Sequence, residues 1–138
     1  MKIYDCFSYW DEDLLLDLRL NILNEYVDYF VIVEGNKTWQ NNYKKLRFKV
    51  DNFDKFKNKI IYVPVKDLPD GNNPYLRENH QRNCISRGLV SANENGLIIR
   101  MGFRPGNVYN ESDKSLKHFD FDKMTIFSLS HPELWLGG

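Results

Sequence analysis

An uninterrupted run of apolar residues, Tyr29-Phe30-Val31-Ile32-Val33, constrains the fold of this chain more than any other feature. Aromatic and β-branched residues without polar alternation are typical of a parallel strand that is covered on both faces. Further strand-like segments occupy residues 2–7, 60–65 and 97–99, and helical patterns separate them. This alternation predicts an α/β fold with a mainly parallel, Rossmann-like sheet and flanking helices.

The predicted helices differ in character. After the acidic cluster at residues 11–13, which offers a helix N-cap, apolar residues recur every three or four positions on one face. They are Leu16, Leu20, Leu23 and Val27. Phe53 and Phe56 indicate a short helix with aromatic anchors, and a second long helix with few apolar residues is predicted over residues 75–89. Pro64, inside the third strand, favours an edge or a strand end.

Composition and charge limit the classes of function. With 138 residues, 42% of them hydrophobic, the chain can bury one core, so one domain is expected. Its 19 basic and 19 acidic residues cancel without forming blocks, which disfavours nucleic acid and anionic membranes as partners. No apolar run reaches the roughly 20 residues of a membrane-spanning helix, and no signal sequence is recognisable. We therefore expect a soluble, cytoplasmic protein in which Cys6 and Cys84 are reduced core residues.

Candidate ligand-binding residues follow from the strand ends. In open α/β sheets, ligands bind outside the carboxyl ends of the strands. This rule selects residues 7–11, 34–36, 65–67 and the segment from Arg100 onward. Glu34, directly after the apolar run, can accept hydrogen bonds from a ribose, a base or a sugar at this edge. The alternative is that its carboxylate caps a neighbouring loop.

The polar helix offers a second group of candidates. Arg77 and Gln81, and likewise Glu78 and Arg82, are four residues apart and are therefore neighbours on the helix surface. An arginine in this position can hold a diphosphate through charge-assisted hydrogen bonds. The alternative is that Glu78 and Arg82 form an ordinary surface ion pair.

One pair of carboxylates has the spacing of a metal site. Asp120-Phe121-Asp122 is a D-x-D arrangement, in which two carboxylates can hold Mn²⁺ or Mg²⁺ against diphosphate oxygens. A solvated turn is the alternative. His80, His118 and His131 show no ligand-like spacing and are interpreted as ordinary polar residues. No glycine-rich phosphate loop follows a strand, which disfavours P-loop and dinucleotide-binding folds.

Short blocks with a characteristic order run through the first hundred residues. They are Ile3-Tyr4-Asp5-Cys6-Phe7, Asp13-Leu14-Leu15, Arg19-Leu20-Asn21, Val27-Asp28-Tyr29-Phe30-Val31-Ile32-Val33-Glu34, Asn36-Lys37-Thr38, Lys59-Ile60-Ile61 and Arg77-Glu78-Asn79-His80-Gln81-Arg82-Asn83. Over roughly residues 2–99 this pattern resembles the start of glycosyltransferase family 17. That family contains the β1,4-mannosyl-glycoprotein N-acetylglucosaminyltransferases.

The resemblance implies a GT-A-like fold, a UDP-N-acetylglucosamine donor, a glycan acceptor and a divalent cation, Mn²⁺ or Mg²⁺. It implies that a group of polar residues lies at the donor or supports its site. These residues are Glu34, Asn36, Arg77, Glu78, Gln81 and Arg82, and the candidate metal ligands are Asp120 and Asp122. The expected activity is transfer of N-acetylglucosamine or a similar hexosamine to a glycan. The alternative is a non-catalytic or degenerate sugar-nucleotide-binding fragment of the same ancestry.

The likeness ends near Arg100. In the family, the strand that matches residues 97–99 runs into an acidic Asp-x-Asp-Glu-type segment, whereas here Arg100-Met101-Gly102-Phe103-Arg104-Pro105 follows. We therefore expect residues 1–99 to form the nucleotide-sugar-binding half of the domain. Residues 100–138 are expected to be a divergent, loop-rich remnant of a truncated domain, with one further strand within residues 119–129. An incomplete sheet exposes an edge and an apolar face, so self-association is expected.

Overall fold

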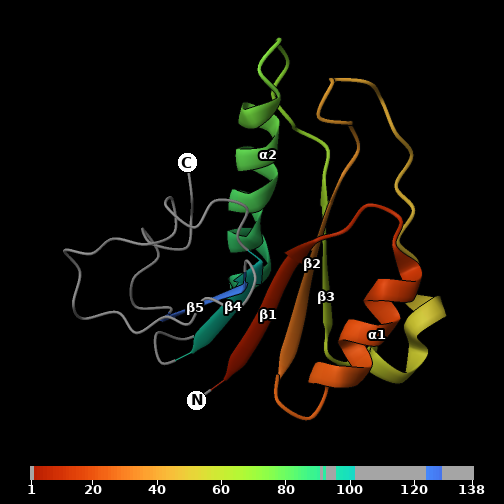
Figure 1. The fold of residues 1–138 in the computed structure, drawn as a ribbon, viewed down its shortest axis with the longest axis vertical. Coiled ribbons are helices and arrows are strands. Elements are labelled where there is room, and N and C mark those ends of the chain that lie inside the picture. Colours follow the sequence, from red (N-terminus) through yellow and green to blue (C-terminus); the bar gives the residue numbers. More distant parts are fainter. Residues whose placement is uncertain (1, 91, 93–95, 102–123, 129–138) are drawn as a thin grey trace.

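The fold is a five-stranded sheet with helices on both faces, seen in a computed structural model that describes residues 2–90, 92, 96–101 and 124–128 (Figure 1). The elements are β1 (Ile3–Ser8), α1 (Asp13–Leu23), β2 (Tyr29–Gly35), the 3₁₀ helix η1 (Val50–Phe56), β3 (Ile60–Val65), α2 (Pro74–Asn83), the 3₁₀ helix η2 (Cys84–Leu89), β4 (Leu97–Met101) and β5 (Met124–Ser128). The predicted α/β class is therefore confirmed.

The strands follow the order β3-β2-β1-β4-β5. Strands β1 to β4 are parallel, and β5 adds to β4 in the antiparallel direction. The further strand that was predicted within residues 119–129 is thus present as β5. Strand β3, which carries Pro64, lies at an edge of the described sheet, as its proline predicted.

Strand β2 explains the unbroken apolar run, because it is buried on both faces. Val31 and Val33 pack on the side of α2 and η2, and Phe30 and Ile32 pack on the side of α1 and η1. All four side chains have an exposed fraction of 0%. Figure 1 shows α2 on one side of the sheet and α1 on the other. The central strands are therefore packed between two apolar layers.

Helix α1 buries the face that the sequence predicted, with Leu16 and Leu20 in the core. The helix ends at Leu23, so the buried Val27 belongs to the turn that follows. Glu12 occupies the N-cap position but makes no side-chain cap. Its carboxylate instead accepts hydrogen bonds from the backbone amides of Trp10 and Asp11. The acidic cluster therefore shapes the turn before the helix rather than capping its first amides.

The helix predicted over residues 75–89 changes type part-way. It is α-helical from Pro74 to Asn83 and continues as the 3₁₀ helix η2. A close approach of η2 to the sheet accompanies this change, because a Cβ atom on Gly88 would lie 2.6 Å from Cγ1 of Val31 and 3.1 Å from Cγ2 of Val63. Only a glycine fits this contact without displacing β-strand side chains.

Gly88→Ala is accordingly expected to lower the free energy of unfolding by about 1–3 kcal/mol, because the added methyl overpacks the core. Urea denaturation measures this loss. Ser86→Ala, on the exposed side of the same 3₁₀ helix, is the matched control and should change stability by less than about 0.5 kcal/mol. Equal stability of the two variants would contradict the close packing of η2.

Both cysteines are free and buried, as predicted. Among the described helices, none is both long enough and apolar enough to span a membrane.

Candidate functional site

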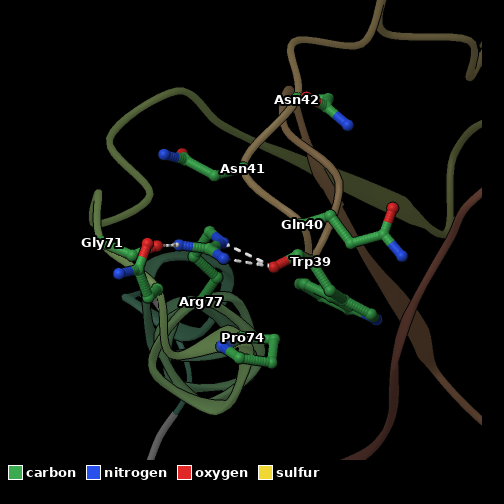
Figure 2. A pocket seen from close by; sticks show the side chains of 8 residues that line it. Trp39, Gln40, Asn41, Asn42, Gly71, Pro74 and Arg77 are labelled. Atoms are coloured by element: carbon green, nitrogen blue, oxygen red, sulfur yellow. Dashed lines mark hydrogen bonds between the residues drawn. The ribbon is translucent and has the colours of Figure 1, made fainter.

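A polar pocket lies beyond the carboxyl ends of β2 and β3, where the sheet topology predicts ligand binding. We call it the rim pocket; its volume is about 540 Å³. Its lining comes from the loop after β2, the loop after β3 and the start of α2 (Figure 2). The lining residues are Trp39, Gln40, Asn41, Asn42, Gly71, Asn72, Pro74 and Arg77.

The lining of the rim pocket combines an indole ring with four side-chain amides. An amide group offers both donors and an acceptor, and an indole offers an apolar face for a ring. Asn41 sits at φ 69°, a left-handed turn conformation that asparagine tolerates. Within the described residues, its Oδ1 atom is buried and accepts no hydrogen bond. The pocket therefore presents side-chain amides beside an aromatic surface.

Arg77 holds the rim pocket together. Its side chain is buried, with an exposed fraction of 2%. The guanidinium donates to the carbonyl oxygen of Trp39 from Nε at 2.8 Å and also from Nη2. Its Nη1 donates to the carbonyl oxygen of Gly71 at 2.7 Å (Figure 2). The same atom donates to the carbonyl oxygen of Pro69 at 3.3 Å. Arg77 thus joins the two loops that form the pocket, and its hydrogen bonds go to backbone carbonyls.

Glu34 is the centre of a buried hydrogen-bond cluster at the end of β2. Its side chain has an exposed fraction of 0%. Oε2 accepts from Nζ of Lys44 at 2.9 Å and from the amide of Arg47 at 2.7 Å. Oε1 accepts from the amide of Phe48 at 3.0 Å and from the hydroxyl of Tyr62 at 2.8 Å. This is the arrangement expected if the carboxylate caps a neighbouring loop.

Electrostatics keep Glu34 ionised. Burial acts to raise its pKa, but the hydrogen bonds from Arg47, Lys44, Phe48 and Tyr62 outweigh burial, so the pKa lies below its ordinary value. Glu34 does not line the rim pocket. Its role at a donor is untested and stays a prediction.

The other predicted donor residues lie around the same edge. Asn36 follows β2, and its buried Oδ1 accepts no hydrogen bond within the described residues. Gln81 is buried between α2 and β2, where its Nε2 donates to the carbonyl of Val33 at 3.3 Å. Arg82 donates to Glu78 at 2.9 Å, and the side chains of this pair are 7% and 20% exposed. The pair is therefore largely buried, and donor binding by these residues also stays a prediction.

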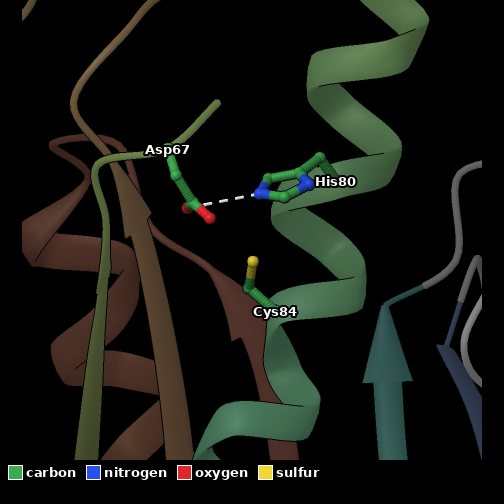
Figure 3. A group of neighbouring side chains, drawn as sticks. All are labelled: Asp67, His80 and Cys84. Carbon is green, nitrogen blue, oxygen red and sulfur yellow. Dashed lines mark ion pairs between the residues drawn. The ribbon is translucent and has the colours of Figure 1, made fainter. Parts of the chain in front are cut away.

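The structure brings together three groups that can bind a metal ion. Asp67 follows β3, His80 lies on α2, and Cys84 begins η2 (Figure 3). One ligand atom from each residue lies within 4.8 Å of the other two. The predicted metal ligands Asp120 and Asp122 lie outside the described residues.

The amino-terminal part of the chain matches a family model. Residues 1–102 match the model of glycosyltransferase family 17, which is most of the 138 residues. The chain belongs to glycosyltransferase family 17. A search of curated proteins and a search of solved structures each found no significant match.

The family 17 match spans the whole of the site described above. It covers the four parallel strands, both loops of the rim pocket and the Glu34 cluster. The matched region therefore includes the edge of the sheet at which open α/β folds generally bind ligands.

Sequence reasoning missed two features of this family 17 chain. Trp39 was not among the candidate residues, although a tryptophan in a polar loop after a buried strand is a usable signal. The spacing of His80 and Cys84, four residues apart on a helix, could have indicated a shared face. Asp67, in contrast, lies in a segment that the strand-end rule had selected.

Proposed function

We propose that this chain binds a UDP-sugar at the rim pocket and transfers N-acetylglucosamine, or a similar hexosamine, to a glycan acceptor. Membership of glycosyltransferase family 17 supports glycosyl transfer. The choice of N-acetylglucosamine and of a glycan acceptor follows the resemblance to N-acetylglucosaminyltransferases. The single observation that carries the proposal is that the family match includes a polar pocket at the carboxyl edge of the sheet.

The chemistry of the pocket suits a nucleotide sugar. A uracil or sugar ring can stack on the indole of Trp39, since stacking on an aromatic face needs no particular base. The amides of Asn41, Asn42 and Asn72 can donate to and accept from hydroxyl and carbonyl groups.

The diphosphate of the donor needs positive charge during transfer, because negative charge develops on the leaving group. Among the residues that line the rim pocket, none is a carboxylate. The pocket lining alone therefore does not fit Mn²⁺ or Mg²⁺, which prefer oxygen ligands with negative charge. In the proposal, Asp120 and Asp122 supply these ligands from the segment between β4 and β5.

A second candidate function is sugar-nucleotide binding without catalysis. Arg100, rather than a carboxylate, continues β4, and the lining of the rim pocket carries no acidic group. Both observations favour binding that needs no metal ion.

Calorimetry with UDP and UDP-N-acetylglucosamine, with and without Mn²⁺, separates the two functions. Metal-dependent binding with turnover supports transfer, and metal-independent binding without turnover supports the second function. Trp39→Ala is expected to weaken binding at least about fivefold, because stacking on an aromatic ring contributes about 1–3 kcal/mol per base. Tyr43→Ala, at an aromatic residue that is 80% exposed and outside the pocket lining, should leave affinity unchanged. Absence of binding to either nucleotide would contradict both functions.

A further inference from the structure

A compact set of three unlike ligand atoms lies where β3, α2 and η2 meet. His80 and Cys84 are four residues apart, so both project from one face of the same helical segment. Asp67 reaches them from the loop after β3, with its carboxylate 3.3 Å from Nε2 of His80 (Figure 3). The carboxylate oxygen, the imidazole nitrogen and the thiol sulfur all lie within 4.8 Å of one another.

The donor atoms point to a particular class of cation. Thiolate and imidazole are ligands of Zn²⁺ and its neighbours, whereas Mg²⁺ and Mn²⁺ prefer oxygen. Metal–ligand bonds of about 2.0–2.3 Å in a tetrahedron place ligand atoms roughly 3.3–3.8 Å apart, so a shift of about 1 Å would close the site. Cys84 is buried at 3% exposure. Asp67 is exposed, with 57% of its side chain accessible, which leaves room for water as a fourth ligand.

We propose that Asp67, His80 and Cys84 form a binding site for a thiophilic divalent cation of the Zn²⁺ class. This site is separate from the rim pocket, because none of its three residues lines that pocket. The proposal does not depend on glycosyl transfer, since it rests on the arrangement of these three ligand atoms and not on a sugar donor. When bound, the cation ties the loop after β3 to the junction of α2 and η2.

Arg87 offsets the negative charge of Asp67 when no metal ion is bound. Its guanidinium donates to both oxygens of Asp67, at 3.1 and 2.7 Å. This pairing holds the pKa of Asp67 well below its ordinary value, and burial raises the pKa of the Cys84 thiol. An incoming cation therefore competes with Arg87 for the carboxylate and displaces the thiol proton to solvent.

Titration of the 138-residue chain with Co²⁺ tests the proposal. A thiolate bound to Co²⁺ gives a near-ultraviolet charge-transfer band, and Zn²⁺ should abolish it by displacement. Cys84→Ser is expected to lose the band, while Cys6→Ser, which changes the other buried free cysteine, should keep it. His80→Gln and Asp67→Asn should each weaken binding at least about tenfold. A wild-type chain without the band, or a band that depends on Cys6 instead, overturns the proposal.

Arg87→Gln gives a result that misfolding cannot imitate. Removing the guanidinium beside the site should tighten Co²⁺ and Zn²⁺ binding by roughly tenfold. The metal ion then has no competitor for the Asp67 carboxylate and no neighbouring positive charge that repels it. Arg87 is 46% exposed, so its replacement is tolerated by the fold. Unchanged or weaker affinity in this variant contradicts a site centred on Asp67.

Discussion

Replacement of Glu34 by alanine is expected to lower the free energy of unfolding by about 3–5 kcal/mol, as removal of one partner from a buried ion pair does. The carboxylate is fully buried and accepts four hydrogen bonds. Its loss leaves Lys44, which is only 7% exposed, without its counter-charge. The amides of Arg47 and Phe48 lose their acceptor as well. Urea denaturation at neutral pH measures the effect.

Two smaller changes separate the contributions to this cluster. Tyr62→Phe removes one hydrogen bond and keeps the ring, so a loss of about 1 kcal/mol is expected. Glu34→Gln keeps the shape of the side chain and removes its charge, and its effect should fall between those of the other two variants. If Glu34→Ala were no more destabilising than Tyr62→Phe, the ionic cluster would contribute little to stability.

The pH dependence of the Glu34 cluster has a definite sign. The pKa of Glu34 in the folded chain lies below its ordinary value of 4.5. Its charge therefore contributes stability fully above the unfolded-state pKa, and that contribution is lost as the pH falls through the lower, folded-state pKa. The difference in stability between wild type and Glu34→Gln should shrink below about pH 4.5. A difference that stays constant between pH 7 and pH 3 would contradict this assignment.

Arg77→Ala is expected to destabilise the chain by roughly 3 kcal/mol, because the carbonyl oxygens of Trp39, Pro69 and Gly71 lose a buried charged donor. The two loops of the rim pocket are then no longer joined. Hydrogen exchange at the amides of residues 38–42 should increase, and nucleotide binding should weaken together with stability.

Two other arginine variants test whether the geometry of the Arg77 side chain matters. Arg77→Lys should recover little of the loss, since an ammonium group cannot reproduce the planar fork that reaches both loops. Arg47→Ala is the control, because that side chain is 55% exposed and its guanidinium pairs with the surface residue Asp11. Its effect should stay below about 1 kcal/mol. Full rescue by lysine would mean that the stabilising effect of Arg77 comes from its charge alone and not from the geometry of its guanidinium.

Strands and core faces were predictable because they depend on local patterns. The run before Glu34 needs cover on both sides, whatever surrounds it, and Leu16 and Leu20 share a helix face by spacing alone. The change from α2 to η2 was not predictable from spacing. It accompanies the contact between Gly88 and β2, which brings together residues distant in the sequence.

The candidate site was only partly predictable, because its polar residues form hydrogen bonds with loops that are distant in the sequence. The sequence singled out Glu34 at a strand end and Arg77 on the polar helix, but the carbonyls bound by Arg77 belong to residues up to 38 positions away. Similarly, the four donors to Glu34 come from a loop and from β3. Such partners become visible only when tertiary structure is known. The strand-end rule selected residues 34–36 and 65–67, and the rim pocket lies beyond the ends of the two strands that precede them.

Pro64 determines what can attach to the outer side of β3. The carbonyls of Lys59 and Val65 accept hydrogen bonds from Phe30 and Asn36, so the odd-numbered residues of β3 direct their backbone toward β2. Because this direction alternates along a strand, Pro64 faces outward, and it has no N–H to donate. A strand from another molecule would meet a pyrrolidine ring where it needs a donor. The β3 edge of the sheet is thereby a poor template for fibril growth.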